Sequence, residues 1–459
     1  MRVPLILVLL MLALLVYPVA ASQPTKSVVY TIEETHRLQN YSTNAANDVV
    51  ATILIFDNRS GHASQHVLSE QVEVDGVPIS PDISSTEDNR IARISLGTIL
   101  PDGSKTITVT QTIMVDKVGP IDPNTVQGNV PADFLVYTEP IANLWESDNQ
   151  VIIGKAAELT AGQPNFYLKA RGIFDFVKDY LTYQEQLEEH GAVWAYDHRS
   201  GDCTEFTNLF IALCRAAGIP TKFVSGYSYR SGDENLERMG HAFALMYLPN
   251  VGWAPVDLTW PLHQGQFGEL GNDHLVQLTS DGKNMVKDGR VTVPGNGVTW
   301  SYDASGPNPN LKFEYTGRIT REIAVEAKLT GGGIQDNMGR FSVNVKNIGL
   351  QTVTNLRVEL SADVNYFEVP PARDISSLAG GAQQTVSFDV GVKADVENSP
   401  LKASVIYDSS YGTFLAEDQI SVSVIVSAPH GEAINILLLA IIAVIIGSII
   451  AVVAVLLRR

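Results

Sequence analysis

Cys203 stands where a helix is expected to begin, in the segment Gly-Asp-Cys-Thr-Glu-Phe at residues 201–206. Asp202 is a suitable N-cap, so Cys203 falls in the first turn of a helix predicted over residues 203–217, which a Gly-Ile-Pro run at 218–220 ends. Unpaired N–H groups and the helix dipole stabilise a thiolate there, and the thiolate is the nucleophilic form of cysteine. The pattern predicts a reactive thiol at Cys203.

The chain holds two cysteines, and the second, Cys214, lies on the same predicted helix. The two are about 16 Å apart along the helix axis, so they cannot form a disulfide without breaking the helix. Cys214 falls among apolar residues of that helix, and we interpret it as an inert core residue. The reactive role is therefore assigned to Cys203.

A thiolate nucleophile needs a base, and the base needs an orienting partner. Of the nine histidines, His241 combines a predicted strand, residues 241–248, with a carboxylate on the next predicted strand. If the two strands form a hairpin with a loop at 248–250, Asp257 lies opposite His241. A longer loop shifts the pairing by a residue or two, which still leaves the side chains within reach. A carboxylate there would hold one ring nitrogen and leave the other facing Cys203.

Each of these residues has a simpler interpretation on its own. A histidine in a strand is more often structural than catalytic, and an aspartate near a strand end is more often a cap or turn residue. The joint arrangement, a cysteine at a helix start with a histidine and an aspartate on adjoining strands, favours a triad.

Residues 194–260 resemble the transglutaminase-like superfamily of papain-fold proteins. The family's Gly-x-Cys-x-Glu-aromatic motif corresponds to residues 201–206, and its Arg-Ala-Ala-Gly-Ile-Pro helix end corresponds to 215–220. Its His-Ala-Trp motif appears as His-Ala-Phe at 241–243, and its Gly-Trp-x-x-x-Asp-x-Thr motif appears at 252–259.

Two further segments support this resemblance. Residues 223–227, Phe-Val-Ser-Gly-Tyr, match the strand that follows the family's cysteine helix, and the predicted helix 167–183 ends in a tyrosine as in many family members. The helix extends the resemblance to about residues 150–265. The departure is Phe243, which stands where a tryptophan is common and removes no reacting group.

The resemblance implies that Cys203 is the nucleophile, His241 the general base and Asp257 its orienting partner. It also implies an upstream aromatic residue that helps to stabilise the oxyanion. Trp194 and Tyr196 are the candidates, with simple packing beneath the site as the alternative. The expected chemistry is attack of the thiolate on an amide carbonyl, giving a thioester that an amine or water resolves. The sequence leaves the acyl acceptor open.

No cofactor and no metal are expected. The cysteines and histidines do not cluster at metal-ligand spacing, and neither an EF-hand loop nor a glycine-rich phosphate loop occurs. The net charge of −18, from 32 basic and 50 acidic residues, would repel phosphate, so nucleic acid is not an expected partner. The expected partner is a protein or peptide substrate.

The two ends of the 459-residue chain predict membrane anchoring. A long apolar run and a small-residue cleavage pattern predict a signal peptide at residues 1–21, with an uncleaved N-terminal anchor as the alternative. Residues 433–457 carry no charge and are long enough to span a bilayer, and the two arginines at 458–459 follow directly. These features predict a single-pass protein of the cell membrane with an extracellular ectodomain and a short cytoplasmic C-terminus.

The predicted fold class is multidomain. Alternating apolar residues predict an N-terminal β-sandwich over residues 22–120, and helices followed by strands predict an α+β transglutaminase-like domain over 121–300. A Gly-Pro-Asn-Pro-Asn run makes residues 301–325 an expected linker. Residues 326–427 are typical of an Ig-like β-sandwich and loosely resemble Ig-like modules of archaeal surface proteins. One C-terminal transmembrane helix completes the prediction.

These observations favour a cell-surface thiol enzyme that acts on protein or peptide amide bonds, as a protease or amidase or by transglutaminase-type acyl transfer. The alternative is a non-catalytic structural or binding protein that retains the same fold, which β-rich modules on a stalk also suit. The intact set of Cys203, His241 and Asp257 favours the enzyme. Substrate and oligomeric state stay open.

Overall fold

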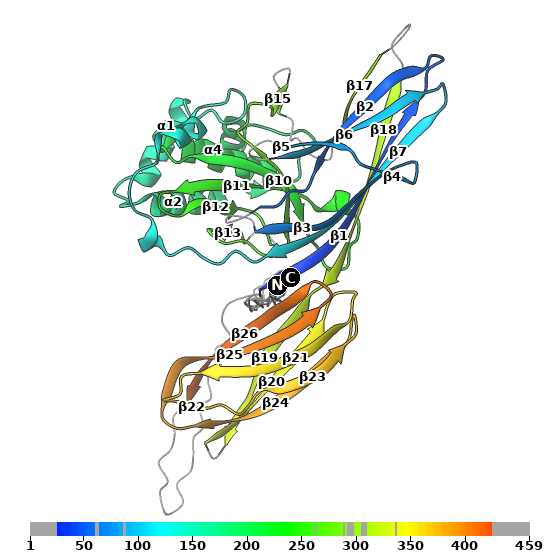
Figure 1. The fold of residues 1–459 in the computed structure, drawn as a ribbon. Helices are drawn as coiled ribbons and strands as arrows, with labels where there is room; N and C mark the ends of the chain where they lie inside the picture. Colours follow the sequence, from blue (N-terminus) through cyan, green and yellow to red (C-terminus); the bar gives the residue numbers. More distant parts are fainter. Residues whose placement is uncertain are drawn as a thin grey trace, which may run out of the picture.

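The computed structural model describes residues 25–59, 64–85, 89–261, 264–287, 290–291, 298–303, 310–335 and 337–424. The predicted signal peptide and the predicted transmembrane segment with its tail lie outside these residues. In the part of the chain that the structure describes, no helix is long and apolar enough to cross a membrane. Figure 1 shows a mixed α/β part beside one β part, with a second β part toward the C-terminus.

The N-terminal β part consists of two antiparallel sheets, with strand orders β18-β1-β7-β3-β4 and β17-β2-β6-β5. Its strands up to the α/β part are β1 (Ser27–Asn40), β2 (Ala46–Ile55), β3 (Gln65–Val74), β4 (Val77–Ile79), β5 (Asp82–Ser85), β6 (Arg90–Ile99) and β7 (Ser104–Asp116). Alternate residues point inward, so Leu38, Ile53, Ile94 and Val109 share one buried core.

The strands that complete these sheets come from the segment predicted to be a linker. β17 (Val298–Asp303) and β18 (Leu311–Ile323) lie within or across residues 301–325, so the linker prediction is wrong. β18 pairs with β1 from Val29↔Ile323 to Asn40↔Leu311. Its alternating apolar residues contribute to the buried core, which explains why it is a strand rather than a connector. The α/β part is therefore inserted between β7 and β17 (Figure 1).

Within the described residues, the α/β part holds all four α-helices and a five-stranded antiparallel sheet of order β13-β12-β11-β10-β14. The helices are α1 (Gln150–Thr160), α2 (Phe166–Tyr180), α3 (Ala192–His198) and α4 (Cys203–Ala216). The strands are β8 (Thr182–Tyr183), β9 (Ser200–Gly201), β10 (Thr221–Ser228), β11 (Gly240–Leu248), β12 (Gly252–Asp257), β13 (Gln266–Phe267), β14 (His274–Ser280), β15 (Val286–Lys287) and β16 (Arg290–Val291). Short 3₁₀ turns are η1 (Pro123–Thr125), η2 (Ala132–Thr138) and η3 (Leu236–Met239).

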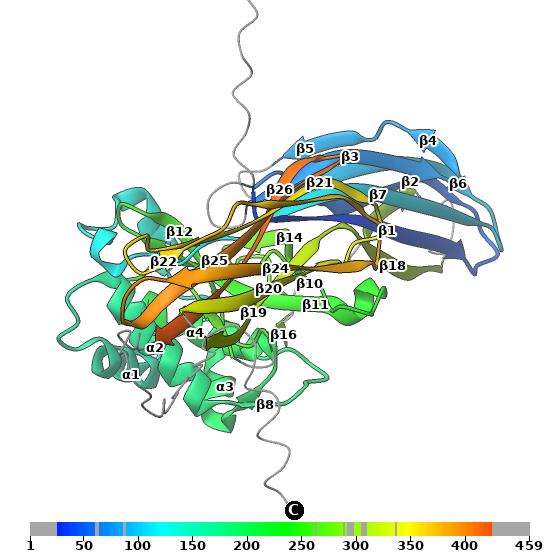
Figure 2. The same ribbon diagram turned by 90° about the horizontal axis from the view of Figure 1, so that it is seen from below.

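Helix α4 lies at the centre of the α/β part. It packs against β10 and β11 and against the other three helices. From Thr204 to Arg215 every residue of α4 is buried, so the helix is held on all sides. Figure 2 shows the helices gathered on the side of this part away from the N-terminal sheets.

The N-terminal sheet supports the α/β part directly. Tyr30 and Ile32 of β1 share a buried cluster with Tyr227 of β10 and with Leu236 and Met239 of η3. Because η3 leads straight into β11, the segment that precedes His241 is packed against β1 and its neighbours.

The C-terminal β part has two four-stranded antiparallel sheets, of orders β19-β20-β24-β22 and β23-β21-β25-β26, around one core (Figure 2). Its strands are β19 (Val325–Gln335), β20 (Met338–Asn347), β21 (Val353–Ala362), β22 (Phe367–Glu368), β23 (Arg373–Leu378), β24 (Gln383–Val392), β25 (Val396–Ser409) and β26 (Gly412–Val424). The Ig-like assignment stays a prediction. Val29 of β1 and Ile323 of β18 reach this core, which joins the two β parts.

Candidate active site

Cys203 is the first residue of α4, as the sequence predicts, and its thiol is free and partly exposed. The N-cap is Asp202, whose side chain accepts the N–H of Thr204 at 2.9 Å. Glu205 completes a capping box, because its Oε2 accepts the N–H of Asp202 at 2.9 Å. The helix start is therefore fixed, and the Cys203 N–H belongs to the first-turn donors that no helical carbonyl satisfies.

The spacing of the Gly-x-Cys-x-Glu motif has a steric cause. A Cβ on Gly201 would lie 2.2 Å from the Cβ of Glu205, so only glycine fits under the returning glutamate. The buried Glu205 carboxylate also accepts the N–H of His190 at 2.8 Å, which ties the preceding loop to the helix start. Burial and then the negative charge of Asp202 raise the pKa of Glu205 to about 8.

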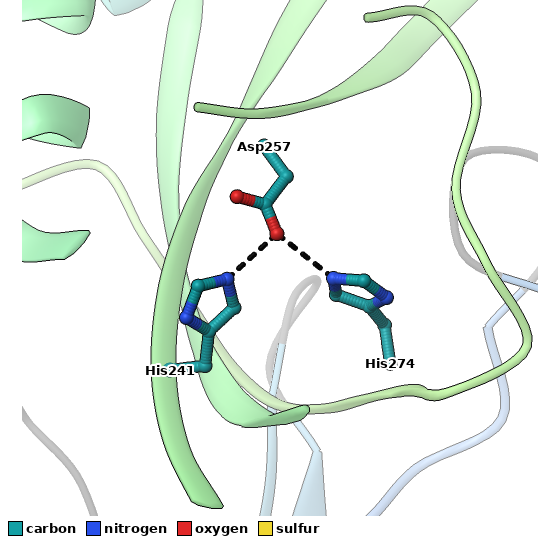
Figure 3. A group of neighbouring side chains, drawn as sticks. All are labelled: His241, Asp257 and His274. Carbon is teal, nitrogen blue, oxygen red and sulfur yellow. Dashed lines mark hydrogen bonds and ion pairs between the residues drawn. The ribbon is translucent and has the colours of Figure 1, made fainter. Parts of the chain in front are cut away.

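The β11–β12 hairpin brings His241 and Asp257 together. Its register runs from Ala244↔Val256 to Leu248↔Gly252, so the loop is 249–251, one residue further along the chain than the 248–250 loop considered above. Continued by one pair, this register sets Asp257 beside Phe243, two residues from His241 on the same face of the sheet. The His241 Nε2 atom lies 2.6 Å from Asp257 Oδ2 (Figure 3).

His241 also meets the Cys203 thiol, which acts on it as a hydrogen-bond partner. Because Asp257 takes Nε2, the thiol is left with Nδ1. Burial lowers the pKa of His241, but the charge and hydrogen bond of Asp257, followed by Cys203, outweigh it and raise the pKa to about 9. The imidazole, whose side chain is 8% exposed, is therefore protonated at neutral pH.

Asp257 is fully buried and fully hydrogen-bonded. Its Oδ1 atom accepts the N–H groups of Thr259 at 2.8 Å and Trp260 at 3.0 Å. Burial raises the pKa of Asp257, but the charge and hydrogen bond of His241 and the bond from His274 hold it far below its usual value. Asp257 is therefore an ionised carboxylate in the protein interior.

These three residues lie within a stretch of sequence that matches a known family model. Residues 153–258 match the family model described as the transglutaminase-like superfamily. This part of the chain is a transglutaminase-like domain. The matched stretch contains Cys203, His241 and Asp257, so the residues that meet in space are those that lie inside the family match.

The chain is also similar, at low identity, to proteins from other organisms. The chain is 25% identical over 122 residues to the uncharacterized protein YebA of Bacillus subtilis strain 168, a match that covers 23% of this chain and 17% of YebA. A candidate cysteine protease from Cytophaga hutchinsonii is 17% identical, with 65% of this chain and 99% of that one covered and a TM-score of 0.43.

Two further solved structures show weaker likeness. The periplasmic domain of TgpA from Pseudomonas aeruginosa, bound to ethylmercury, is 16% identical, covers 51% of this chain and 89% of its own, and has a TM-score of 0.27. The transglutaminase of red sea bream is 10% identical, covers 84% and 92%, and has a TM-score of 0.25. The assignment of the domain therefore rests on the family match.

The transglutaminase-like domain has a second histidine at the site, which the sequence analysis did not identify. His274 Nε2 lies 2.8 Å from the same Asp257 Oδ2 atom that binds His241, so one oxygen joins two imidazoles (Figure 3). A Cβ on Gly226 of β10 would lie 1.9 Å from the Leu275 carbonyl oxygen, so glycine lets β14 approach closely enough to place His274. The Asp-His pair before a strand was visible in the sequence, but the pairing of β14 with β10 was not.

Two groups of side chains in the domain offer ligand-type atoms within 4.8 Å of one another. They are His241 with Asp257 and His274, and Glu189 with Asp202 and Glu205. In the first group the separations of 2.6 and 2.8 Å are those of hydrogen bonds from ring N–H groups to a carboxylate. In the second, two carboxylates form the capping box of α4. The expectation of no metal stays a prediction.

Trp194 and Tyr196, the predicted oxyanion aromatics, have other neighbours. The Trp194 ring stacks between two histidine rings, with centroid distances of 3.7 and 4.1 Å. Tyr196 packs against Tyr180 at 5.0 Å. Within the described residues, neither makes a hydrogen bond or ring contact with Cys203 or His241, and their auxiliary role stays a prediction.

Tyr183 lies near enough to Cys203 for the charge of the thiolate to act on its hydroxyl. The parallel pairing of β8 with β9 sets Tyr183 beside Gly201, two residues before Cys203. Burial and then the negative charge of Cys203 raise the pKa of Tyr183 to about 12, so its hydroxyl keeps its proton. This proximity could not be predicted from the sequence, because the pairing of β8 with β9 is only two residues long.

Proposed function

We propose that this protein is a cell-surface thiol enzyme that acts on protein or peptide amide bonds through Cys203, His241 and Asp257. The observation that carries the proposal is the position of His241 between a free thiol at a helix start and a buried, ionised carboxylate. The family match over the same residues supports a cysteine acyl-transfer chemistry.

In the acylation half, the Cys203 thiolate attacks the amide carbonyl carbon. A C–S bond forms and the carbonyl π electrons move to oxygen, where the Cys203 N–H can donate a hydrogen bond. His241 then gives its Nδ1 proton to the leaving nitrogen, the C–N bond breaks, and a thioester remains. Asp257 holds the ring in the orientation that this transfer needs.

In the second half, neutral His241 takes a proton from water or from an amine as that nucleophile attacks the thioester. The C–S bond breaks, and Cys203 returns as a thiolate beside a protonated imidazole. Water gives hydrolysis, and an amine such as a lysine side chain gives transfer. Both outcomes use the same residues, so the choice depends on which nucleophile reaches the thioester.

The location proposed for this chemistry rests on the sequence. The predicted signal peptide at 1–21 and membrane segment at 433–457 would place the β parts and the transglutaminase-like domain outside the cell. The C-terminal β part would then act as a spacer between the membrane and the domain.

An electrophilic glutamine or peptide probe tests the enzyme directly. The full-length protein should form a covalent adduct at Cys203, detected by mass spectrometry of its peptides. Cys203→Ala should abolish the adduct, whereas Cys214→Ala, at the fully buried cysteine of the same helix, should leave it in place. Equal labelling of wild type and Cys203→Ala would contradict the proposal and favour a non-catalytic surface protein with this fold.

A further inference from the structure

His274 is bound on both sides by carboxylates. Its Nε2 atom lies 2.8 Å from Asp257 Oδ2, and its Nδ1 atom lies 2.8 Å from Asp273 Oδ1. The other oxygen of Asp273 accepts the indole N–H of Trp260 at 2.8 Å. His274 itself has no exposed side-chain surface. The chain His241–Asp257–His274–Asp273 is therefore continuous and mostly buried.

The geometry determines where the protons are. An ionised carboxylate can only accept hydrogen bonds, so each ring nitrogen of His274 must carry a proton to bond with its partner. A histidine with both nitrogens protonated is an imidazolium. Burial lowers the pKa of His274, but the hydrogen bonds and charges of Asp257 and Asp273 raise it to about 9, which agrees with a proton on each ring nitrogen.

We propose that His274 is a positioning residue of the triad: a buried imidazolium between Asp257 and Asp273 that fixes the Asp257 carboxylate and weakens its hold on the proton of His241. The inference rests on the proposed function, since it concerns how the same triad works. The family match ends at residue 258, so His274 lies outside it.

Two effects follow from one hydrogen bond. His274 donates a hydrogen bond to Oδ2, and this bond prevents the Asp257 side chain from turning away from His241. Its positive charge, with ring centroids 5.8 Å apart, also disfavours a second imidazolium at His241. Since His241 must give its proton to the leaving nitrogen, a carboxylate that held this proton more tightly would slow that step.

Several charged and titratable groups lie around His274. They are Asp257 on β12, Asp273 just before β14, His241 on β11, Tyr30 on β1, Arg230 after β10 and Arg321 on β18. Arg230 lies over the Trp260 ring at 5.5 Å and Arg321 over the Tyr229 ring at 5.0 Å. The two carboxylates are the charged groups that hydrogen-bond to His274.

Histidine ¹⁵N spectra of the full-length protein test the inference. At pH 8 one buried histidine, identified by its loss in His274→Gln, should have both ring nitrogens protonated. In His274→Gln, which keeps a donor for Asp257 and removes the charge, the protonation midpoint of His241 should rise by about 1 pH unit. The control His66→Gln, on β3 beside Asp116, should leave that midpoint unchanged.

Asp273→Asn keeps the test valid if His274→Gln does not fold. It replaces the ionised carboxylate at Nδ1 with a neutral amide, which can donate as well as accept, so the midpoint of His274 itself should fall. A neutral His274 at pH 8 in the wild type, or a His241 midpoint that His274→Gln does not move, would overturn the inference alone. Thiol labelling at Cys203 that is independent of His241 would overturn the proposed function and the inference with it.

Discussion

Gly226 and Leu275 lie so close that a Cβ on the glycine would be 1.9 Å from the Leu275 carbonyl oxygen. This contact joins β10 to β14, the strand at the edge of the sheet, at a register irregularity between Ser225 and Gly226. His274 is the residue next to Leu275, so its place beside Asp257 depends on that close approach.

Gly226→Ala should therefore destabilise the transglutaminase-like domain. The added methyl group must push β14 away from β10, which we expect to cost about 1–3 kcal/mol in the free energy of unfolding. Urea denaturation measures the loss. Gly154→Ala is the matched control, because that exposed glycine lies inside α1 with nothing within 4 Å of the added Cβ. The control should be neutral or stabilise the protein by up to about 1 kcal/mol; equal effects of the two changes would contradict the packing described here.

Glu34 predicts a pH dependence of stability at the junction between β1 and the transglutaminase-like domain. The buried carboxylate accepts hydrogen bonds from Tyr227, Tyr315 and Gln277. Burial, opposed in part by these hydrogen bonds, raises the pKa of Glu34 from 4.5 to about 7. Because the folded state holds this proton more tightly than the unfolded state, Glu34 contributes its full stability below pH 4.5. This contribution to the free energy of unfolding is lost as the pH rises through about 7.

The matching experiment compares the wild type with Glu34→Gln, which cannot ionise. Relative to the variant, the wild type should lose about 3 kcal/mol of unfolding free energy between pH 4.5 and pH 8. Urea titrations of both proteins across that range measure the difference. Parallel pH curves for the two proteins would show that Glu34 does not hold its proton in the folded state.

Asp257→Asn should lower the pKa of His241 from about 9 toward or below its ordinary value, because an amide supplies no charge. At pH 7.5 the ring would then be mostly neutral, and reaction of Cys203 with the peptide probe should slow by about 10²-fold or more. Initial rates of adduct formation measure this. Asp175→Asn, at an exposed partner of Arg171 on α2, serves as the control and should react like the wild type. Wild-type rates in Asp257→Asn would show that the aspartate has no role in the reaction of Cys203.

The place of β18 predicts the behaviour of fragments. A fragment of residues 22–300 ends where the sequence suggested that a domain should end, yet it lacks β18 and leaves the edge of β1 unpaired. An open edge of this length is an aggregation site. The fragment should be less soluble and melt at a lower temperature than one of residues 22–324, as measured by light scattering and thermal unfolding. Equal behaviour of the two would mean that β18 is dispensable.

The same strand shows where sequence reasoning failed. Leu311, Phe313 and Tyr315 alternate with polar residues, which is the pattern of a strand, but the nearby Gly-Pro-Asn-Pro-Asn run suggested a connector. The pairing of β18 with β1 joins residues that are 271 to 294 positions apart in the sequence, with the α/β part between them. Patterns within a short window cannot reveal such a partner.

The triad was more accessible to sequence reasoning because its parts are local. A capped helix start gives the position of Cys203, and a hairpin of two neighbouring strands gives His241 and Asp257. His274 could not be predicted because it depends on the pairing of β10 with β14, which are not consecutive strands. Tyr183 could not be predicted because the pairing of β8 with β9 is only two residues long and spans helix α3. Local geometry was predictable from the residues, and tertiary pairing was not.

The pH dependence of iodoacetamide labelling at Cys203, measured in the full-length protein and in His241→Ala, tests the central claim most directly. The fully buried Cys214 provides an internal reference within the same digest. A thiolate paired with the His241 imidazolium predicts labelling that stays fast well below pH 8.5, the ordinary range of a free thiol, and that collapses in the variant. Slow labelling with an ordinary thiol profile, unchanged by His241→Ala, would show that the triad is not assembled and would contradict the account.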